Sequence, residues 1–162
     1  MINTNFEKKV FAFFISVFFL TACHGPQDVY FSTYDEAIKN GAIENGNIPD
    51  AMPRSAHEIY QKSGSGAGGM WLRFKFGMND IYGFVSQAEE VKPVDFNSIK
   101  IPSPRVKWWD RDLKKDISKE GLTLKVYRYK REIRYDINNS KIVSAYFVID
   151  WDSHIVYYWH EL

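Results

Sequence analysis

Two pairs of side chains in this sequence have residue types that could catalyse a hydrolysis: His57 with Glu58, and Asp152 with His154. An imidazole and a carboxylate held together can act as general base and general acid. His57–Glu58 also begins like the zinc-protease motif, which needs a second His four residues after the first so that both ligands share one helix face. This chain has Gln61 at that position. The pairs therefore leave open an envelope hydrolase acting on glycan, lipid or peptide, without a zinc site.

Three alternating side chains, Asp150, Asp152 and His154, could turn toward one metal ion. A calcium-binding loop needs more carboxylates, a Gly at its sixth position and a later Glu, and this segment lacks them. Asp and Ser also favour turns through local hydrogen bonds to the backbone. The sequence therefore predicts a turn here, and it predicts neither a metal nor a cofactor.

Trp108 and Trp109 lie in a segment, residues 105–115, that mixes aromatic side chains with charges of both signs. Adjacent residues of a strand point to opposite sides, so one indole could belong to the core while the other is exposed. An exposed Trp beside Lys or Arg is typical of a membrane interface, a sugar-binding surface or a protein interface. The alternative is that both indoles are covered by the core or by neighbouring loops.

Basic and aromatic residues also interleave over residues 128–135, a pattern that can hold single-stranded nucleic acid. The formal net charge of the whole chain is only +1, which gives no field that would attract a polyanion. A solvated sheet face with cross-strand pairs accounts for the pattern more simply. We therefore expect no nucleic-acid partner.

The N-terminus carries the pattern of an export signal. Lys8 and Lys9 precede an unbroken apolar run, residues 10–20. A membrane-spanning helix needs roughly 20 apolar residues, whereas a shorter run behind a basic end is typical of a secretory signal peptide. The run ends in Leu20–Cys23, whose sequence is Leu-Thr-Ala-Cys.

These four residues and the run before them resemble the lipobox of bacterial lipoprotein precursors. The resemblance implies cleavage of residues 1–22 as a signal peptide and lipidation of Cys23. The lipids implied are a diacylglycerol on the Cys23 thiol and a further acyl chain, such as palmitate, on its new amino group. Two or three acyl chains make a membrane anchor effectively permanent. His24, rather than Asp, follows the cysteine. In a host with two membranes this implies a protein on the outer membrane that faces the periplasm.

The mature chain has the composition of a folded domain, since 17% of the whole sequence is aromatic and 25% is charged. Removing residues 1–22 takes away Lys8, Lys9 and Glu7, which leaves no net charge. Residues 23–30 are expected to form a short tether, and residues 31–162 a single domain. Cys23 is the only cysteine, so no disulfide can form within the chain.

The fold class that the patterns favour is α+β. We expect an antiparallel sheet of about five strands, backed by short helices and closed by a C-terminal β-meander. Capping boxes at Thr33 and Ser55 predict two short helices, the first ending at Gly41, and residues 80–90 predict a third. The expected strands cover residues 70–76, 122–129, 132–137, 142–149 and 155–159.

No complete catalytic set accompanies the anchor. The sequence therefore favours a non-enzymatic, membrane-anchored binding protein of the cell envelope with a protein partner, in its sharpest form an immunity-type inhibitor of a periplasmic toxin. The segments 49–59 and 71–76 also resemble a pattern found in small uncharacterised bacterial lipoproteins. That resemblance implies an α+β lipoprotein and carries no assigned activity.

Overall fold

The computed structural model describes residues 28–44, 48–64, 69–117, 124–136 and 139–160. Residues 1–22, which the sequence predicts to be a signal peptide, lie outside these ranges, as do Cys23 and His24. Within them, no helix is long and apolar enough to cross a membrane. The elements in chain order are β1 (Asp28–Thr33), α2 (Tyr34–Lys39), β2 (His57–Ser63), β3 (Met70–Lys75), α3 (Ile81–Val85), β4 (Glu89–Glu90), the 3-10 helix η2 (Pro93–Ser98), α4 (Leu113–Ile117), β5 (Leu124–Asp136), β6 (Asn139–Asp150) and β7 (Ile155–His160).

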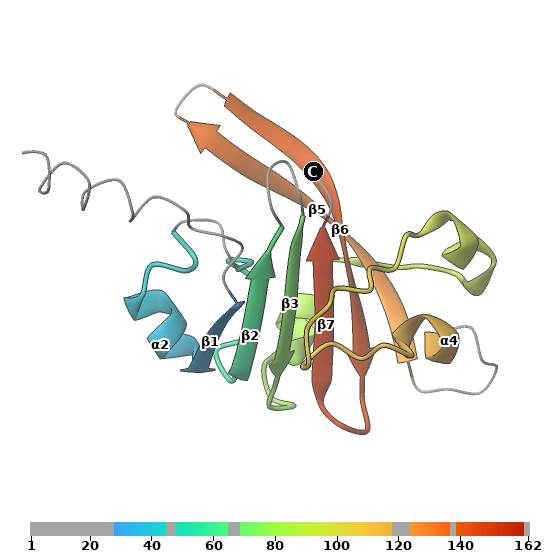
Figure 1. Cartoon of the computed structure of the whole chain (residues 1–162), viewed down its shortest axis with the longest axis horizontal. Helices are drawn as coiled ribbons and strands as arrows, with labels where there is room; N and C mark the ends of the chain where they lie inside the picture. The colour runs from blue at the N-terminus through green and yellow to red at the C-terminus, as the bar shows by residue number, and fades with distance from the viewer. Residues whose placement is uncertain (1–27, 45–47, 65–68, 118–123, 137–138, 161–162) are drawn as a thin grey trace, which may run out of the picture.

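The described strands form one antiparallel sheet of seven strands in the order β1-β2-β3-β7-β6-β5-β4. The expectation of about five strands was therefore wrong, and the structure is mostly sheet, with no described helix longer than six residues. The C-terminal meander β5-β6-β7 is present as predicted. A second meander, β1-β2-β3, precedes it, and the pairing of β3 with β7 joins the two (Figure 1).

The first capping box forms the predicted helix. The Thr33 hydroxyl accepts from the Glu36 amide at 3.2 Å, while the Glu36 carboxylate accepts from the Ser32 amide at 2.7 Å. These bonds occupy backbone donors that have no partner inside a helix. Gly41 follows the helix with φ of 69°, a left-handed conformation that favours glycine.

The second capping box does not form a helix, because Ser55 is engaged elsewhere. Its backbone amide donates to the Asp80 carboxylate at 2.8 Å, its hydroxyl also donates to that carboxylate, and the hydroxyl accepts from the Gly77 amide at 2.8 Å. The residues that follow Ser55 form β2 instead. A Cβ on Gly77 would lie 3.1 Å from the Ser55 Cβ, so a larger residue at position 77 would require Ser55 to shift by a few tenths of an ångström.

Three other boundaries differ from the expectation. The helix expected over residues 80–90 is only α3, which is followed by the two-residue strand β4. Residues 28–30, which the sequence assigned to the tether, form the first half of β1. Residues 122–129 and 132–137 were expected as separate strands, but β5 runs continuously through Lys130 and Arg131, because no turn residue interrupts it.

Both faces of the sheet are covered. Alternate residues of β7 belong to different cores: Val156 and Tyr158 pack on the face that α2 and α3 cover, and Tyr157 and Trp159 pack on the other. The chain leading to α4 crosses in front of β7 on this second face (Figure 1). It covers β7, β6 and β5 there with the buried side chains of Ile99, Val106, Trp109, Leu113 and Ile117.

Candidate functional site

An open groove of about 560 Å³ lies on the second face, where β2, β3 and β7 meet the segment that precedes α4. Its size falls in the range of ligand pockets. We call it the Trp108 groove. Its lining residues are Glu58, Tyr60, Arg73, Lys107, Trp108, Trp109, Asp110 and Tyr157.

Strand register sets the floor of the Trp108 groove. Tyr60 of β2 pairs with Arg73 of β3, and Arg73 pairs with Tyr157 of β7. Residues paired in this way lie side by side on one face of a sheet. The Arg73 guanidinium carbon lies 5.6 Å from the centroid of the Tyr60 ring, which is a cation–π contact. Three neighbouring strands therefore present a continuous row of polar and aromatic side chains.

The two tryptophans have different positions in this groove. Trp109 is 3% exposed, and its indole Nε1 donates to the Pro102 carbonyl at 3.2 Å. Its ring packs edge-on against Tyr157 at a centroid distance of 5.4 Å. Trp108 is half-buried and stacks on Tyr60, with centroids 5.8 Å apart and planes at 24°. Trp109 thus fixes the segment to the sheet, while Trp108 remains partly exposed at the groove.

The aromatic surface continues beyond the Trp108 groove toward the edge of the sheet. Tyr30 of β1 is 51% exposed, and its ring centroid lies 4.9 Å from that of Tyr60. Tyr60 and Trp108 extend the row toward the segment before α4. Such a row of rigid, partly exposed rings can be covered by a partner with little loss of side-chain entropy.

Charges of both signs line the groove in equal number: Glu58 and Asp110 against Arg73 and Lys107. The Asp110 carboxylate accepts from the Asp112 amide at 2.8 Å, which holds it in place. Burial raises the pKa of the Tyr157 hydroxyl, and Arg73 offsets part of this rise. A balanced, aromatic groove fits a surface that is itself part polar and part apolar, and it gives no preference for a polyanion.

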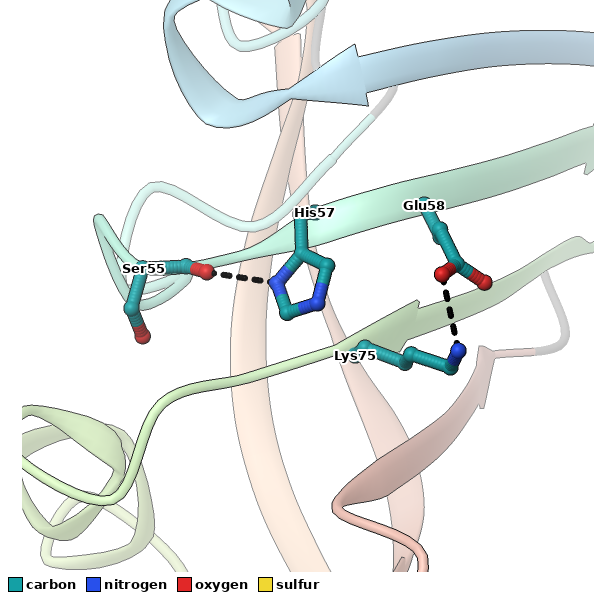
Figure 2. Close-up of polar contacts among 4 residues, drawn as sticks. All are labelled: Ser55, His57, Glu58 and Lys75. Atoms are coloured by element: carbon teal, nitrogen blue, oxygen red, sulfur yellow. Dashed lines mark hydrogen bonds and ion pairs between the residues drawn. The ribbon is translucent and has the colours of Figure 1, made fainter.

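The structure gives His57 and Glu58 different partners. The Nδ1 atom of His57 lies 3.0 Å from the Ser55 carbonyl oxygen, and the Nζ atom of Lys75 donates to the Glu58 carboxylate at 2.7 Å (Figure 2). Glu58 has φ of 48°, at the bulge where β2 loses its regular register with β3. Neither contact arranges the two side chains as an acid–base pair.

Lys75 holds the pKa of Glu58 below its usual value, chiefly through this hydrogen bond. Because the pKa of Glu58 is lower in the folded protein, the ion pair stabilises the fold at pH values above the pKa of Glu in the unfolded chain. This stabilisation is lost as the pH falls through the pKa of Glu58 in the folded protein. We expect Lys75→Met to raise the pKa of Glu58, measured by NMR titration of its side-chain carbon. The Lys75 and Glu58 side chains are 34% and 39% exposed, so solvent screens the pair and its loss costs about 1 kcal/mol at most of unfolding free energy at pH 7. A difference that stays constant down to pH 2 would contradict this account.

Asp152 and His154 lie in the turn that joins β6 to β7. The Asp150 carboxylate accepts from the backbone amides of Asp152 and Ser153, each at 3.1 Å. The His154 carbonyl accepts from the Phe76 amide at 3.1 Å, and the two rings lie 5.5 Å apart. The two bonds to the Asp150 carboxylate are local bonds of the kind that the turn interpretation predicts, whereas the contacts with Phe76 tie the turn to the end of β3.

Neither proposed catalytic pair lines the Trp108 groove as a pair. Glu58 is among its lining residues, and His57, Asp152 and His154 are not. In the part of the chain that the structure describes, no group of three or more His, Cys, Asp or Glu side chains could hold a metal ion. Cys23 lies outside that part, so its lipidation remains a prediction.

Sequence reasoning selected Trp108 and Trp109 but missed Tyr60, Arg73 and Tyr157. Tyr60 and Arg73 alternate with buried residues of their strands, whereas Tyr157 is itself buried within a run of buried residues in β7. A pattern within one strand shows only which residues of that strand, two positions apart, share a face of the sheet. Their convergence depends on the β3–β7 register, which joins residues far apart in the chain.

Comparison with known proteins bears on one part of this site. Residues 26–75 match the YbbD head domain. The described part of the match contains β1, α2, β2 and β3. No curated protein and no solved structure matches the chain. The segment similar to the YbbD head domain supplies Glu58, Tyr60 and Arg73 to the groove, and the rest of the chain supplies Trp108 and its neighbours.

Proposed function

We propose that this protein is a lipid-anchored lipoprotein of the cell envelope that binds a protein partner and catalyses no reaction. Its anchor is the acylated Cys23, and in a host with two membranes it stands on the outer membrane and faces the periplasm. In its sharpest form it is an immunity-type inhibitor that captures a periplasmic toxin.

The observation that carries the binding function is the half-buried Trp108 stacked on Tyr60 in an open groove beside Arg73. Trp, Tyr and Arg are the residues that most often supply the binding energy of protein interfaces. Tyr60 and Arg73 belong to a sheet, and Trp108 is held beside the buried Trp109, so the surface needs little ordering when a partner binds.

The test is capture of the partner from envelope extract by the native lipoprotein, by Trp108→Ala and by Tyr82→Ala. Tyr82 is a matched control, because it is 61% exposed and stacks on Trp151, away from the groove. We expect Trp108→Ala to weaken the affinity for the recovered partner about thirtyfold, or about 2 kcal/mol, and Tyr82→Ala to leave it unchanged. Equal capture by both variants would contradict the proposed site.

The anchor is tested separately by intact mass and membrane fractionation of the native protein beside Cys23→Ala. We expect a lipid mass increment and membrane partition in the native protein only. A native protein without the increment would remove the anchor from the proposal and leave the groove untouched.

A further inference from the structure

The β5–β6 hairpin extends beyond the rest of the sheet. The last residue of β7 that pairs with β6 is His160, opposite Ala145. On the other side of the hairpin, the pairing of β4 with β5 ends at Arg128. Beyond these two points the described residues of β5 and β6 pair only with each other, from the pair Lys130 and Ser144 to the pair Asp136 and Asn139. We call residues 130–136 and 139–144 the arm. The six residues from Ser144 to Asn139 give it a length of about 20 Å, and it rises past the ends of β2, β3 and β7 (Figure 1).

The arm extends from the end of the sheet at which β1 begins. Register shows this directly: Asp28 pairs with Lys62, Lys62 with Trp71, Trp71 with Trp159, and Trp159 with Tyr146. These residues form one row across the sheet, and Tyr146 is next to the residue where the arm separates from β7. The chain before Asp28 therefore joins the sheet at the same end from which the arm projects.

The length of the tether brings this end close to a membrane. The argument rests on the proposed anchor, because it takes Cys23 as the point of attachment. Asp28 is the fifth residue after Cys23, and five residue steps of fully extended chain span at most about 18 Å. The arm is at least as long as the tether can reach, so its outer part lies within reach of the lipid headgroups.

The described side chains of the arm suit an anionic lipid surface. Ile142 is 72% exposed, the largest exposed fraction among the large hydrophobic residues that the structure describes. Lys130 is exposed and pairs with Ser144, two residues from Ile142, so Lys130 and Ile142 lie on one face of the arm. Residues 130–144 contain four Lys or Arg against two Asp or Glu. Ile142 pairs directly with Glu132, so the preference for an anionic surface rests on the excess of basic over acidic residues in the arm as a whole. An exposed apolar side chain in a segment with a net positive charge binds the boundary between headgroups and acyl chains.

We propose that the arm is a second membrane contact, which inserts Ile142 into the headgroup region of an anionic phospholipid bilayer while the acyl chains hold Cys23. Two separate points of attachment orient the domain on the membrane, where a single point of attachment would leave it free to rotate. The row Tyr60–Arg73–Tyr157 lies two to three strand residues from the arm end of the sheet, at about 10 Å. The Trp108 groove then opens above the membrane surface.

The sequence offers a direct probe, because Cys23 is its only cysteine and lipidation would block it. Ile142→Cys in the full mature lipoprotein then carries the only free thiol, which takes an environment-sensitive fluorophore. Tyr82→Cys is the matched control, since Tyr82 stacks on Trp151 in the β6–β7 turn, at the opposite end of the sheet. Both labelled proteins are reconstituted in phosphatidylcholine vesicles with and without phosphatidylglycerol, and nitroxide-labelled phospholipid quenches whichever fluorophore reaches the bilayer.

We expect several-fold stronger quenching at position 142 than at position 82, and stronger quenching with phosphatidylglycerol. Lys130→Glu should remove the phosphatidylglycerol increment. Equal quenching at both positions would overturn the arm as a membrane contact. A spectral shift at position 142 that grows with protein concentration in detergent would also overturn it. That result would instead assign the arm to contact with a second copy of the chain. The native protein, without an introduced cysteine, distinguishes failure of the anchor from failure of the arm. If the fluorophore labels its Cys23, that cysteine is not acylated, so the proposed anchor and the argument from tether length both fail.

Discussion

Trp109→Ala is expected to lower the free energy of unfolding by about 3–5 kcal/mol. The indole is 3% exposed and packs edge-on against Tyr157 and Trp159 at centroid distances of 5.4 and 6.3 Å. Its removal leaves a cavity in the second core and also leaves the Pro102 carbonyl without its indole donor. Urea denaturation followed by circular dichroism measures the loss.

The matched control is Trp108→Ala, which changes the same residue type one position away. Trp108 is half-buried and lies at the rim of the groove, so we expect a cost of about 1 kcal/mol or less in unfolding free energy. The two substitutions thus separate stability from binding. Equal destabilisation by both would contradict the assignment of Trp109 to the core and Trp108 to the binding surface.

Asp80→Ala is expected to cost about 2–3 kcal/mol of unfolding free energy, the second largest effect. The Asp80 carboxylate accepts from both the amide and the hydroxyl of Ser55, a partly buried residue. Removing the carboxylate leaves these donors without their acceptor, which costs more than the bonds themselves contribute. It also releases the connection between the turn before β2 and the turn before α3.

Asp50→Ala provides the control, because Asp50 is an exposed carboxylate in the turn before Ser55. We expect a change within about 0.5 kcal/mol. Asp80→Asn keeps an acceptor oxygen and should lie between Asp80→Ala and the unchanged protein. An Asp80→Ala variant as stable as Asp50→Ala would show that the Ser55 contacts do not stabilise the fold.

Strands with regular alternation could be predicted from the sequence. Met70, Leu72 and Phe74 of β3 are buried and alternate with Trp71 and Arg73, as the period of two requires. The strand β2 lacks this signal, because one of its inward positions is the buried Gln61, whose amide donates to the Ser63 hydroxyl. A polar residue in the core and a false capping box at Ser55 together favoured a helix.

The candidate site was only partly predictable for a different reason. Trp108 and Trp109 could be selected by residue type and by their charged neighbours, which are local properties of the chain. The Trp108 groove also needs Arg73 beside Tyr157, and this contact depends on the pairing of two strands that belong to different meanders. The alternation of apolar and polar residues and the composition describe each strand by itself. They do not determine the order of the strands in the sheet.

The way in which β3 joins β7 has a consequence for the kinetics of folding. Neighbouring strands in β1-β2-β3 and in β5-β6-β7 are also neighbours in sequence, whereas Met70 pairs with His160 across most of the chain. Closing so long a loop is entropically costly and slow. We expect each meander to form early and the β3–β7 ladder to form in the rate-limiting step. Until β7 is available, β3 presents an unpaired edge with three apolar side chains, which makes the incompletely folded chain prone to aggregation.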